Sequence, residues 1–233
     1  MRYFLTFLSL LLFAAPAAAD LCAERAAAAT VHILTVSEQK LEDGRIASVV
    51  NSGSGVVINS RANGEAFLLT ALHVVDGSPD EMEVFVVLSD GTVSEAAVAD
   101  KDPINDLAAV VFHNPGDPLP AVDLYRGREP LLGEKVLLLG YPEGSEILRL
   151  RSGLIRELWI EPGGRKTIIV SGAEIYRGDS GGGMFICPAS EKEVDPRPLL
   201  AAIIRGFFAK ETPDGYRRTG LFSAGTPLPA KEH

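Results

Sequence analysis

Short apolar runs follow one another along the chain, and no long stretch keeps the 3.6-residue period of an amphipathic helix. Runs of four to about ten residues rich in Val, Ile and Leu are typical of β-strands. The expected strands span residues 31–36, 46–50, 55–59, 66–70, 82–89, 94–100 and 107–112, and then 135–140, 148–158, 166–170, 183–187, 199–204 and 216–222. The pattern predicts an all-β protein in which helix is a minor component.

Turn signals separate neighbouring runs and favour antiparallel pairing. They are Asp43-Gly44, Asp90-Gly91, Pro162-Gly163-Gly164 and Pro213-Asp214-Gly215. Glycine at such positions supplies the positive φ that tight hairpins require. A proline-rich segment at 114–130 divides the strands into two groups, so we expect two packed barrels or sandwiches.

The first 19 residues are expected to be an export signal. Arg2 precedes the apolar run 4–13, and small residues at 16–19 suit cleavage after Ala19. The run is about half the length of a membrane-spanning helix, so an uncut anchor is the less favoured alternative. We therefore expect an exported protein that is periplasmic or secreted.

Charge and ligand-type residues limit the possible partners. The formal net charge of −9 disfavours nucleic acid and anionic membrane surfaces, and no stable membrane insertion is expected after signal cleavage. No metal site is expected, because the two cysteines are far apart and no histidine pair has ligand spacing. We expect no cofactor, and nothing in the pattern specifies an oligomeric state.

The two cysteines, Cys22 and Cys187, are expected to form a disulfide, because export would place them in an oxidising compartment. The bond would tie the mature N-terminus to the strand expected at 183–187, after Ser180. A lipid-modified Cys22 is the competing interpretation, and Asp20 and Leu21 are poor neighbours for it.

The segment YRGDSGGGM at 176–184 surrounds Ser180 with four glycines, which permit unusual dihedrals and close approach of another molecule. A serine hydroxyl becomes a good nucleophile only beside a base, which a carboxylate orients. His73 follows an apolar strand in FLLTALHVVDG, and Asp106 directly precedes the strand at 107–112. The other histidines are His32 within a strand, His113 in a loop and the terminal His233. Ser180, His73 and Asp106 are therefore the candidates for nucleophilic catalysis.

Four motifs in chain order carry a family resemblance: GSGVVI at 53–58, TALHV at 70–74, NDLAAVV at 105–111 and GDSGGG at 178–183. They resemble the trypsin-like serine proteases, and most of all bacterial HtrA-type protease domains. The resemblance covers nearly all of the chain after residue 19. It implies two antiparallel six-stranded β-barrels of the chymotrypsin type, an N-terminal one at 20–120 and a C-terminal one at 121–225, with a tail at 226–233. It also implies an endopeptidase that hydrolyses protein or peptide substrates.

The resemblance assigns a role to each candidate. Ser180 is the acylated nucleophile, His73 the general base and then acid, and Asp106 the carboxylate that fixes the imidazole tautomer. The backbone N–H groups of Gly178 and Ser180 form the oxyanion hole.

The resemblance also places residues around the substrate. Glu174 lies at the base of the pocket for the P1 side chain, and Arg205 and Gly206 lie on the edge strand that pairs with substrate backbone. Arg205 can neutralise Glu174 or attract an acidic side chain, so we expect no strong preference for a basic P1 residue. Trypsin pairs the aspartate before its serine with a newly cut N-terminus. Here that residue is Asp179, with Arg177 or the mature N-terminal amine as candidate partners.

Two other interpretations remain. Gly178-Asp179-Ser180-Gly181-Gly182 also fits the G-x-S-x-G elbow of α/β-hydrolases, but that fold needs a helix after the serine and the order Ser, acid, His. Here a strand is expected after Ser180, and the order His73, Asp106, Ser180 is that of chymotrypsin. The other alternative is a non-catalytic peptide-binding protein on a trypsin-like scaffold.

Overall fold

A computed structural model describes residues 18–41, 43–77, 82–126, 128–143, 145–188, 197–212 and 215–228. Most of the expected export signal and the end of the expected tail lie outside these residues. The helices of the described part are too short or too polar to cross a bilayer.

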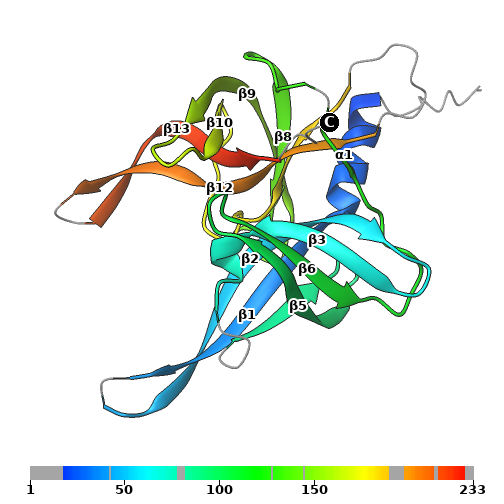
Figure 1. Ribbon diagram of the computed structural model, residues 1–233, viewed down its shortest axis with the longest axis vertical. Coiled ribbons are helices and arrows are strands. Elements are labelled where there is room, and N and C mark those ends of the chain that lie inside the picture. The colour runs from blue at the N-terminus through cyan, green and yellow to red at the C-terminus, as the bar shows by residue number, and fades with distance from the viewer. Residues whose placement is uncertain are drawn as a thin grey trace, which may run out of the picture.

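The first barrel is closed and antiparallel (Figure 1). Its strands are β1 (Thr30–Lys40), β2 (Ile46–Ser60), β3 (Glu65–Ala71), β4 (Met82–Val87), β5 (Val93–Asp102) and β6 (Leu107–His113). They pair in the order β1-β2-β3-β6-β5-β4, and β4 returns to β1. Apolar side chains alternate into the interior, as β4 shows: Val84 and Val86 are buried and the residues between and beside them are not.

The second group of strands forms a seven-stranded sheet, of which six strands close into a barrel. Its strands are β7 (Asp123–Leu124), β8 (Lys135–Gly140), β9 (Arg149–Ile160), β10 (Lys166–Ser171), β11 (Gly183–Ile186), β12 (Leu199–Thr212) and β13 (Gly215–Pro227). The sheet order is β11-β8-β9-β10-β13-β12-β7, and β11 also pairs with β12. β7 is an added strand, parallel to β12. The prediction of two antiparallel six-stranded barrels is confirmed.

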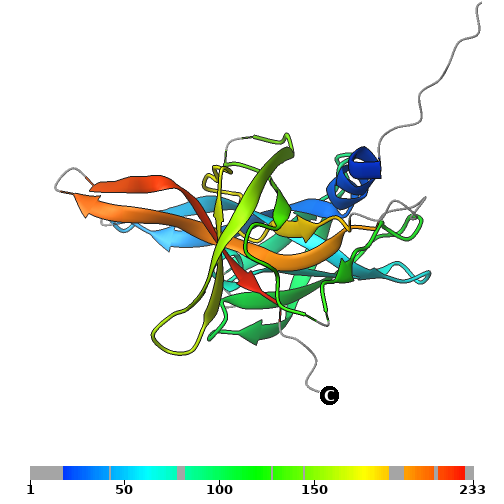
Figure 2. The same cartoon turned by 90° about the horizontal axis from the view of Figure 1, so that it is seen from above.

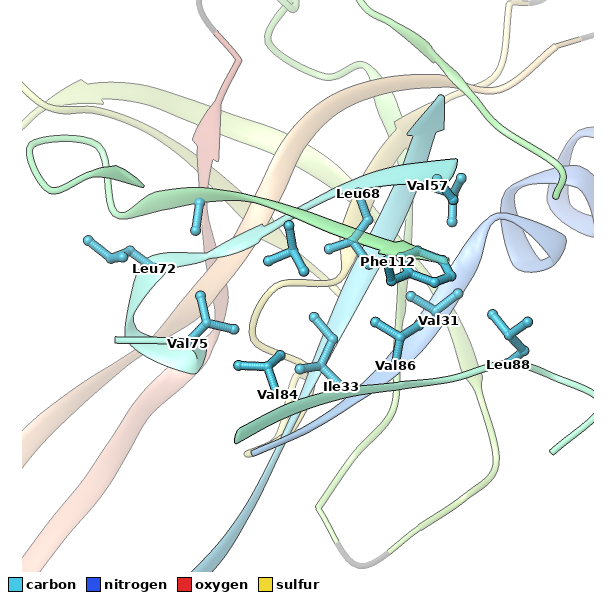
Figure 3. Close-up of a cluster of buried hydrophobic side chains, with 13 residues drawn as sticks. Val31, Ile33, Val57, Leu68, Leu72, Val75, Val84, Val86, Leu88 and Phe112 are labelled. Atoms are coloured by element: carbon cyan, nitrogen blue, oxygen red, sulfur yellow. The ribbon is translucent and has the colours of Figure 1, made fainter. Parts of the chain in front are cut away.

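Three apolar cores hold this arrangement together. Figure 3 shows the core of the first barrel, where Ile33, Leu68 and Phe112 come from different strands. A second core fills the other barrel around Leu138 and Ile168. A third core, which includes Val56 of β2, Phe185 of β11 and Leu200 of β12, joins the barrels. The two barrels therefore pack directly against each other.

The strand predictions were wrong at one place, where two expected strands are a single strand, and they missed two elements. The expected strands 46–50 and 55–59 are one strand, β2, because the polar residues between them keep pairing with β1, from Asn51 opposite Thr35 to Ser54 opposite His32. The proline-rich segment contains β7. An α-helix, α1 (Ala18–Ala28), precedes β1.

Helix α1 is tied to the second barrel, and Figures 1 and 2 show it beside β8 and β12. A disulfide joins Cys22 of α1 to Cys187, which directly follows β11, and Cys22 is buried. Ala26 and Ala29 contribute to the core between the barrels. The structure therefore contains the expected pairing, which leaves no thiol at Cys22 for a lipid.

Candidate active site

A cleft of about 650 Å³ contains the candidate nucleophile and base. Its lining includes His73, Gly178 and Ser180, together with residues of the β1–β2 hairpin such as Thr35 and Asn51. The two barrels thus supply opposite walls of one cleft.

His73 is held at the end of β3 by Asp106. The chain leaves β3 in a 3-10 turn, Leu72–Val74, which carries the imidazole out of the barrel. Asp106 Oδ2 lies 2.8 Å from His73 Nδ1, and Asp106 Oδ1 accepts the backbone N–H of His73 at 3.0 Å. Leu72 N–H donates to the Asp106 carbonyl at 3.0 Å. Asp106 therefore fixes both the backbone and the ring of His73.

Asp106 has an unusual backbone conformation, with φ at 54°. A non-glycine residue in this region costs about 1 kcal/mol or more. The three hydrogen bonds between Asp106 and the His73 turn offset that cost. The conformation aims the carboxylate back at the turn, so it serves the His73 contact.

The electrostatic environment keeps Asp106 ionised. Burial alone would raise the pKa of Asp106, but the hydrogen bond and charge of His73 and the charge of Arg205 outweigh it and lower that pKa. The Asp106 side chain is 15% exposed and that of His73 is 47% exposed. The anionic end of the pair is therefore inside the protein, and the imidazole faces the cleft.

Ser180 lines the same cleft, and its hydroxyl donates to the backbone carbonyl of Arg205 at 3.1 Å. In this rotamer the hydroxyl proton is engaged by a carbonyl on β12 and not by the imidazole. The structure brings Ser180 and His73 to one cleft, and attack on a substrate would require the hydroxyl to turn towards His73.

The loop around Ser180 has the left-handed turns that its glycines permit. Gly178 has φ at 86° and Gly181 at 85°, and a Cβ at Gly178 would collide with the backbone of Pro142 and Glu143. The N–H groups of Asp179, Gly181 and Gly182 donate to protein carbonyls. Those of Gly178 and Ser180 make no hydrogen bond to another of the described residues.

Ser54 of β2 connects this loop to the first barrel. Its N–H donates to the Ser180 carbonyl at 2.8 Å, and its hydroxyl donates to the Gly178 carbonyl at 2.7 Å. The same hydroxyl accepts the N–H of Tyr141 at 2.8 Å, and Thr70 donates to the Ser54 carbonyl at 2.7 Å. Ser54 is fully buried. Sequence reasoning missed it, although it stands in the GSGVVI motif.

The partner of Asp179 is neither of the two candidates taken from the sequence. Arg151 Nη1 of β9 lies 3.0 Å from Asp179 Oδ2. Arg177 is exposed, and its carbonyl accepts the N–H of Glu143. The alternation along β9 could have indicated Arg151, because it lies on the same inward-facing side of the strand as Gly153 and Ile155. A charged side chain on that side needs a buried partner.

The residues expected around the P1 side chain do not line this cleft. Glu174 is half-buried and accepts a hydrogen bond from the Tyr176 hydroxyl at 2.7 Å. The carboxylate that Arg205 pairs with is Glu161, from the β9–β10 turn. Gly206 lies in β12 opposite Ala224. Neither Glu174, Arg205 nor Gly206 belongs to the lining of the 650 Å³ cleft, which extends towards the β1–β2 hairpin.

Two barrels with a His73–Asp106 pair and a serine in the cleft between them define the class of trypsin-like peptidases. Residues 53–188 match the family described as "Trypsin-like peptidase domain", and the chain belongs to this family. Its relatives include the serine endoprotease DegS of Escherichia coli (strain K12), which is 30% identical over 176 residues. That match covers 72% of this chain and 46% of DegS. The periplasmic serine endoprotease DegP of Salmonella typhimurium (strain LT2) is 33% identical over 140 residues, covering 57% of this chain and 27% of DegP.

Solved structures give the same fold. A variant of the HtrA-type protease AlgW with a decapeptide superposes with a TM-score of 0.69 at 23% identity, over 91% of this chain and 63% of that one. AlgW with a tripeptide gives a TM-score of 0.64 at 24% identity, over 91% and 60%. The chain spans about half the length of the DegS proteins it matches.

Proposed function

We propose that the protein is an exported serine endopeptidase that cleaves peptide bonds through an acyl-enzyme on Ser180. The observation that carries this proposal is the double contact of Asp106 with the ring and the backbone of His73, in the cleft that Ser180 also lines. Membership of the trypsin-like peptidase family supports it.

In the proposed reaction, the Ser180 hydroxyl leaves the Arg205 carbonyl and donates to Nε2 of His73, which takes the proton as Oγ attacks the scissile carbonyl. Asp106 keeps the remaining proton on Nδ1 and stabilises the imidazolium. The N–H groups of Gly178 and Ser180 bind the developing oxyanion. His73 then protonates the leaving amine. A water, deprotonated by His73, attacks the acyl carbon, the bond to Ser180 Oγ breaks, and His73 returns the proton to Oγ as the acid product leaves.

The proposed substrates are extended peptides. Solved structures of AlgW, a similar HtrA-type protease, are described with a decapeptide and with a tripeptide. We place substrate backbone along β12 at Arg205 and Gly206, and the P1 side chain near Glu174. Because Glu174 lies outside the lining of the cleft and its carboxylate already accepts the Tyr176 hydroxyl, a strong preference for basic P1 residues is not part of the proposal. Export is supported by the signal-like residues 1–19 and by the periplasmic relative DegP.

The second candidate function is peptide capture without turnover. It is favoured by one observation, the hydrogen bond of the Ser180 hydroxyl to the Arg205 carbonyl, which keeps the hydroxyl proton away from the imidazole.

A fluorophosphonate probe separates the two functions, because it modifies a serine only where the base and the oxyanion hole assist attack. The mature protein is expected to be labelled between about pH 6 and 9, and the variants Ser180→Ala and His73→Ala are expected not to be. Ser48→Ala, which removes an exposed hydroxyl on β2, is the matched control and should label as the wild type does. Absence of labelling in the wild type, or equal labelling of Ser180→Ala, would favour capture.

A peptide library read by mass spectrometry then measures the P1 preference. Cleavage confined to bonds after Lys and Arg would contradict the proposed weak preference for basic residues.

A further inference from the structure

Asp179 lies between the two residues whose N–H groups are proposed to bind the oxyanion, Gly178 and Ser180. Its side chain is 0% exposed and points into the second barrel, away from the cleft. Its Oδ2 accepts the backbone N–H of Tyr176 at 2.6 Å, and its own N–H donates to the Tyr176 carbonyl at 3.1 Å. Any group that fixes the Asp179 carboxylate therefore also fixes the peptide groups on either side of it.

Arg151 reaches this carboxylate from the barrel wall. It lies on β9 opposite Leu138 of β8, and Leu138 in turn lies opposite Met184 of β11. The Arg151 side chain is 13% exposed, and its guanidinium stands over the Tyr176 ring at 5.4 Å from the ring centre. The contact of Arg151 with Asp179 is an ion pair and not an aligned hydrogen bond. Strand pairing and ring contact hold the charge in place.

The charge of Arg151 compensates a costly burial. Burial raises the pKa of Asp179, and the Tyr176 N–H together with the charges of Arg151 and Arg149 opposes that rise. Asp179 Oδ1 has no hydrogen-bond donor among the described residues. A buried carboxylate without a partner is strongly unfavourable, and removing one member of a buried pair leaves the other uncompensated. Without Arg151, Asp179 would have to take a proton or move towards water.

We propose that Arg151 is a positioning residue for the oxyanion hole. Its internal positive charge holds Asp179, and with it the N–H groups of Gly178 and Ser180, in the conformation that receives an oxyanion. The positive charge of Arg151 on β9 thus takes the place of the newly cut N-terminus that pairs with the corresponding aspartate in trypsin. The loop around Ser180 therefore needs no cleavage of the chain to bind an oxyanion. This inference rests on the proposed peptidase function.

Four variants test the inference. Arg151→Met removes the charge at similar length, Asp179→Asn removes the carboxylate, and the double variant removes both. Arg156→Met, an exposed arginine on the same strand, is the matched control. The readouts are the rate of fluorophosphonate labelling, kcat and KM on a peptide from the library, and Tm.

Arg151→Met is expected to lose about 100-fold in kcat and in labelling rate, with KM changed only a few-fold, because the loss of one oxyanion donor has an effect of this size. The double variant is expected to recover to within about tenfold of the wild type, since a neutral amide in the buried position no longer needs a cation. The control is expected to match the wild type. A structural role alone would lower Tm but would not change kcat in the folded protein.

A second arm needs no substitution within the fold. Acetylation of the mature N-terminus, or an extension of it by several residues, is expected to leave the labelling rate unchanged, because the positive charge is internal. This experiment still tests the inference if the Arg151→Met variant does not fold. Loss of labelling on acetylation would overturn the inference.

The outcomes separate this inference from the proposed function. A labelled wild type beside a folded Arg151→Met with unchanged kcat overturns the inference and leaves the function standing. A double variant as slow as Arg151→Met also overturns it, because the defect would then not come from an unpaired carboxylate. An unlabelled wild type overturns both.

Discussion

Replacing Ser54 by alanine would delete one hydroxyl that joins the two barrels. That hydroxyl donates to the Gly178 carbonyl and accepts the Tyr141 N–H, at 2.7 and 2.8 Å. Both partners belong to the second barrel side of the cleft, whereas Ser54 is part of β2 in the first barrel. The backbone bond from Ser54 N–H to the Ser180 carbonyl would remain in Ser54→Ala.

The expected loss of stability follows from the two backbone groups that the substitution leaves without a partner. Ser54, Gly178 and Tyr141 are buried, so water does not replace the hydroxyl. Each unsatisfied buried group costs about 1 to 3 kcal/mol, so we expect the free energy of unfolding to fall by about 2 to 6 kcal/mol. With a urea slope of about 2 kcal/mol/M, the midpoint would shift by about 1 to 3 M.

Activity is expected to fall as well, because the Gly178 peptide loses its anchor. A fall in kcat of about tenfold with little change in KM is expected, less than the 100-fold or more for a donor that is removed outright. Urea unfolding followed by circular dichroism and peptide cleavage are the two assays.

Ser48→Ala is the matched control for this prediction. It lies on the same strand with an exposed hydroxyl and is expected to stay within about 0.5 kcal/mol of the wild type. If Ser54→Ala also stayed within that range and kept its kcat, the argument that this hydroxyl couples the barrels to the loop would be refuted.

Two further predictions concern stability. Replacing Cys22 and Cys187 together by alanine should lower the free energy of unfolding by about 3 to 5 kcal/mol, because the bond closes a loop with a sequence separation of 165 residues. Urea unfolding measures this, and a loss under 1 kcal/mol would contradict it. Burial alone would raise the pKa of Glu161, but its contacts with Arg205, Thr167 and Arg165 lower it to about 2 from 4.5. The stability contributed by Glu161 is therefore present above about pH 4.5 and lost as the pH falls towards 2. As the pH falls over that range, the free energy of unfolding of Glu161→Gln should fall by about 1 to 3 kcal/mol less than that of the wild type. Equal decreases would argue against a stabilising role for the contacts of Glu161.

The strands could be predicted because their cause is local. Apolar alternation and turn glycines such as Gly44 and Gly91, which have φ at 84°, are properties of neighbouring residues. The break expected inside β2 was wrong because the polar residues there are held by pairing with β1, which is a long-range contact. Helix α1 was missed because its alanine-rich segment is short and its position depends on a core between the two barrels.

The candidate site residues were predicted from motifs, but the residues that hold them in position were not. His73 and Asp106 stand at strand ends that the pattern locates, and the structure brings them together. The Asp179 partner was wrong because Arg151 is distant in sequence and reaches the loop through the pairing of β8 with β9 and β11. Which inward-facing charge meets which buried carboxylate is decided by the register of the sheet, which the apolar pattern does not specify.

The bond between Cys22 and Cys187 has a consequence for biosynthesis. A chain made from its N-terminus presents the first cysteine long before the second, and every strand from β1 to β11 lies between them. The sulfur atoms can meet only after the first barrel and four of the six strands of the second barrel have been synthesised. The disulfide therefore stabilises a fold that the burial of apolar residues has already determined. An oxidant that acts earlier meets only Cys22, without Cys187 to pair with it.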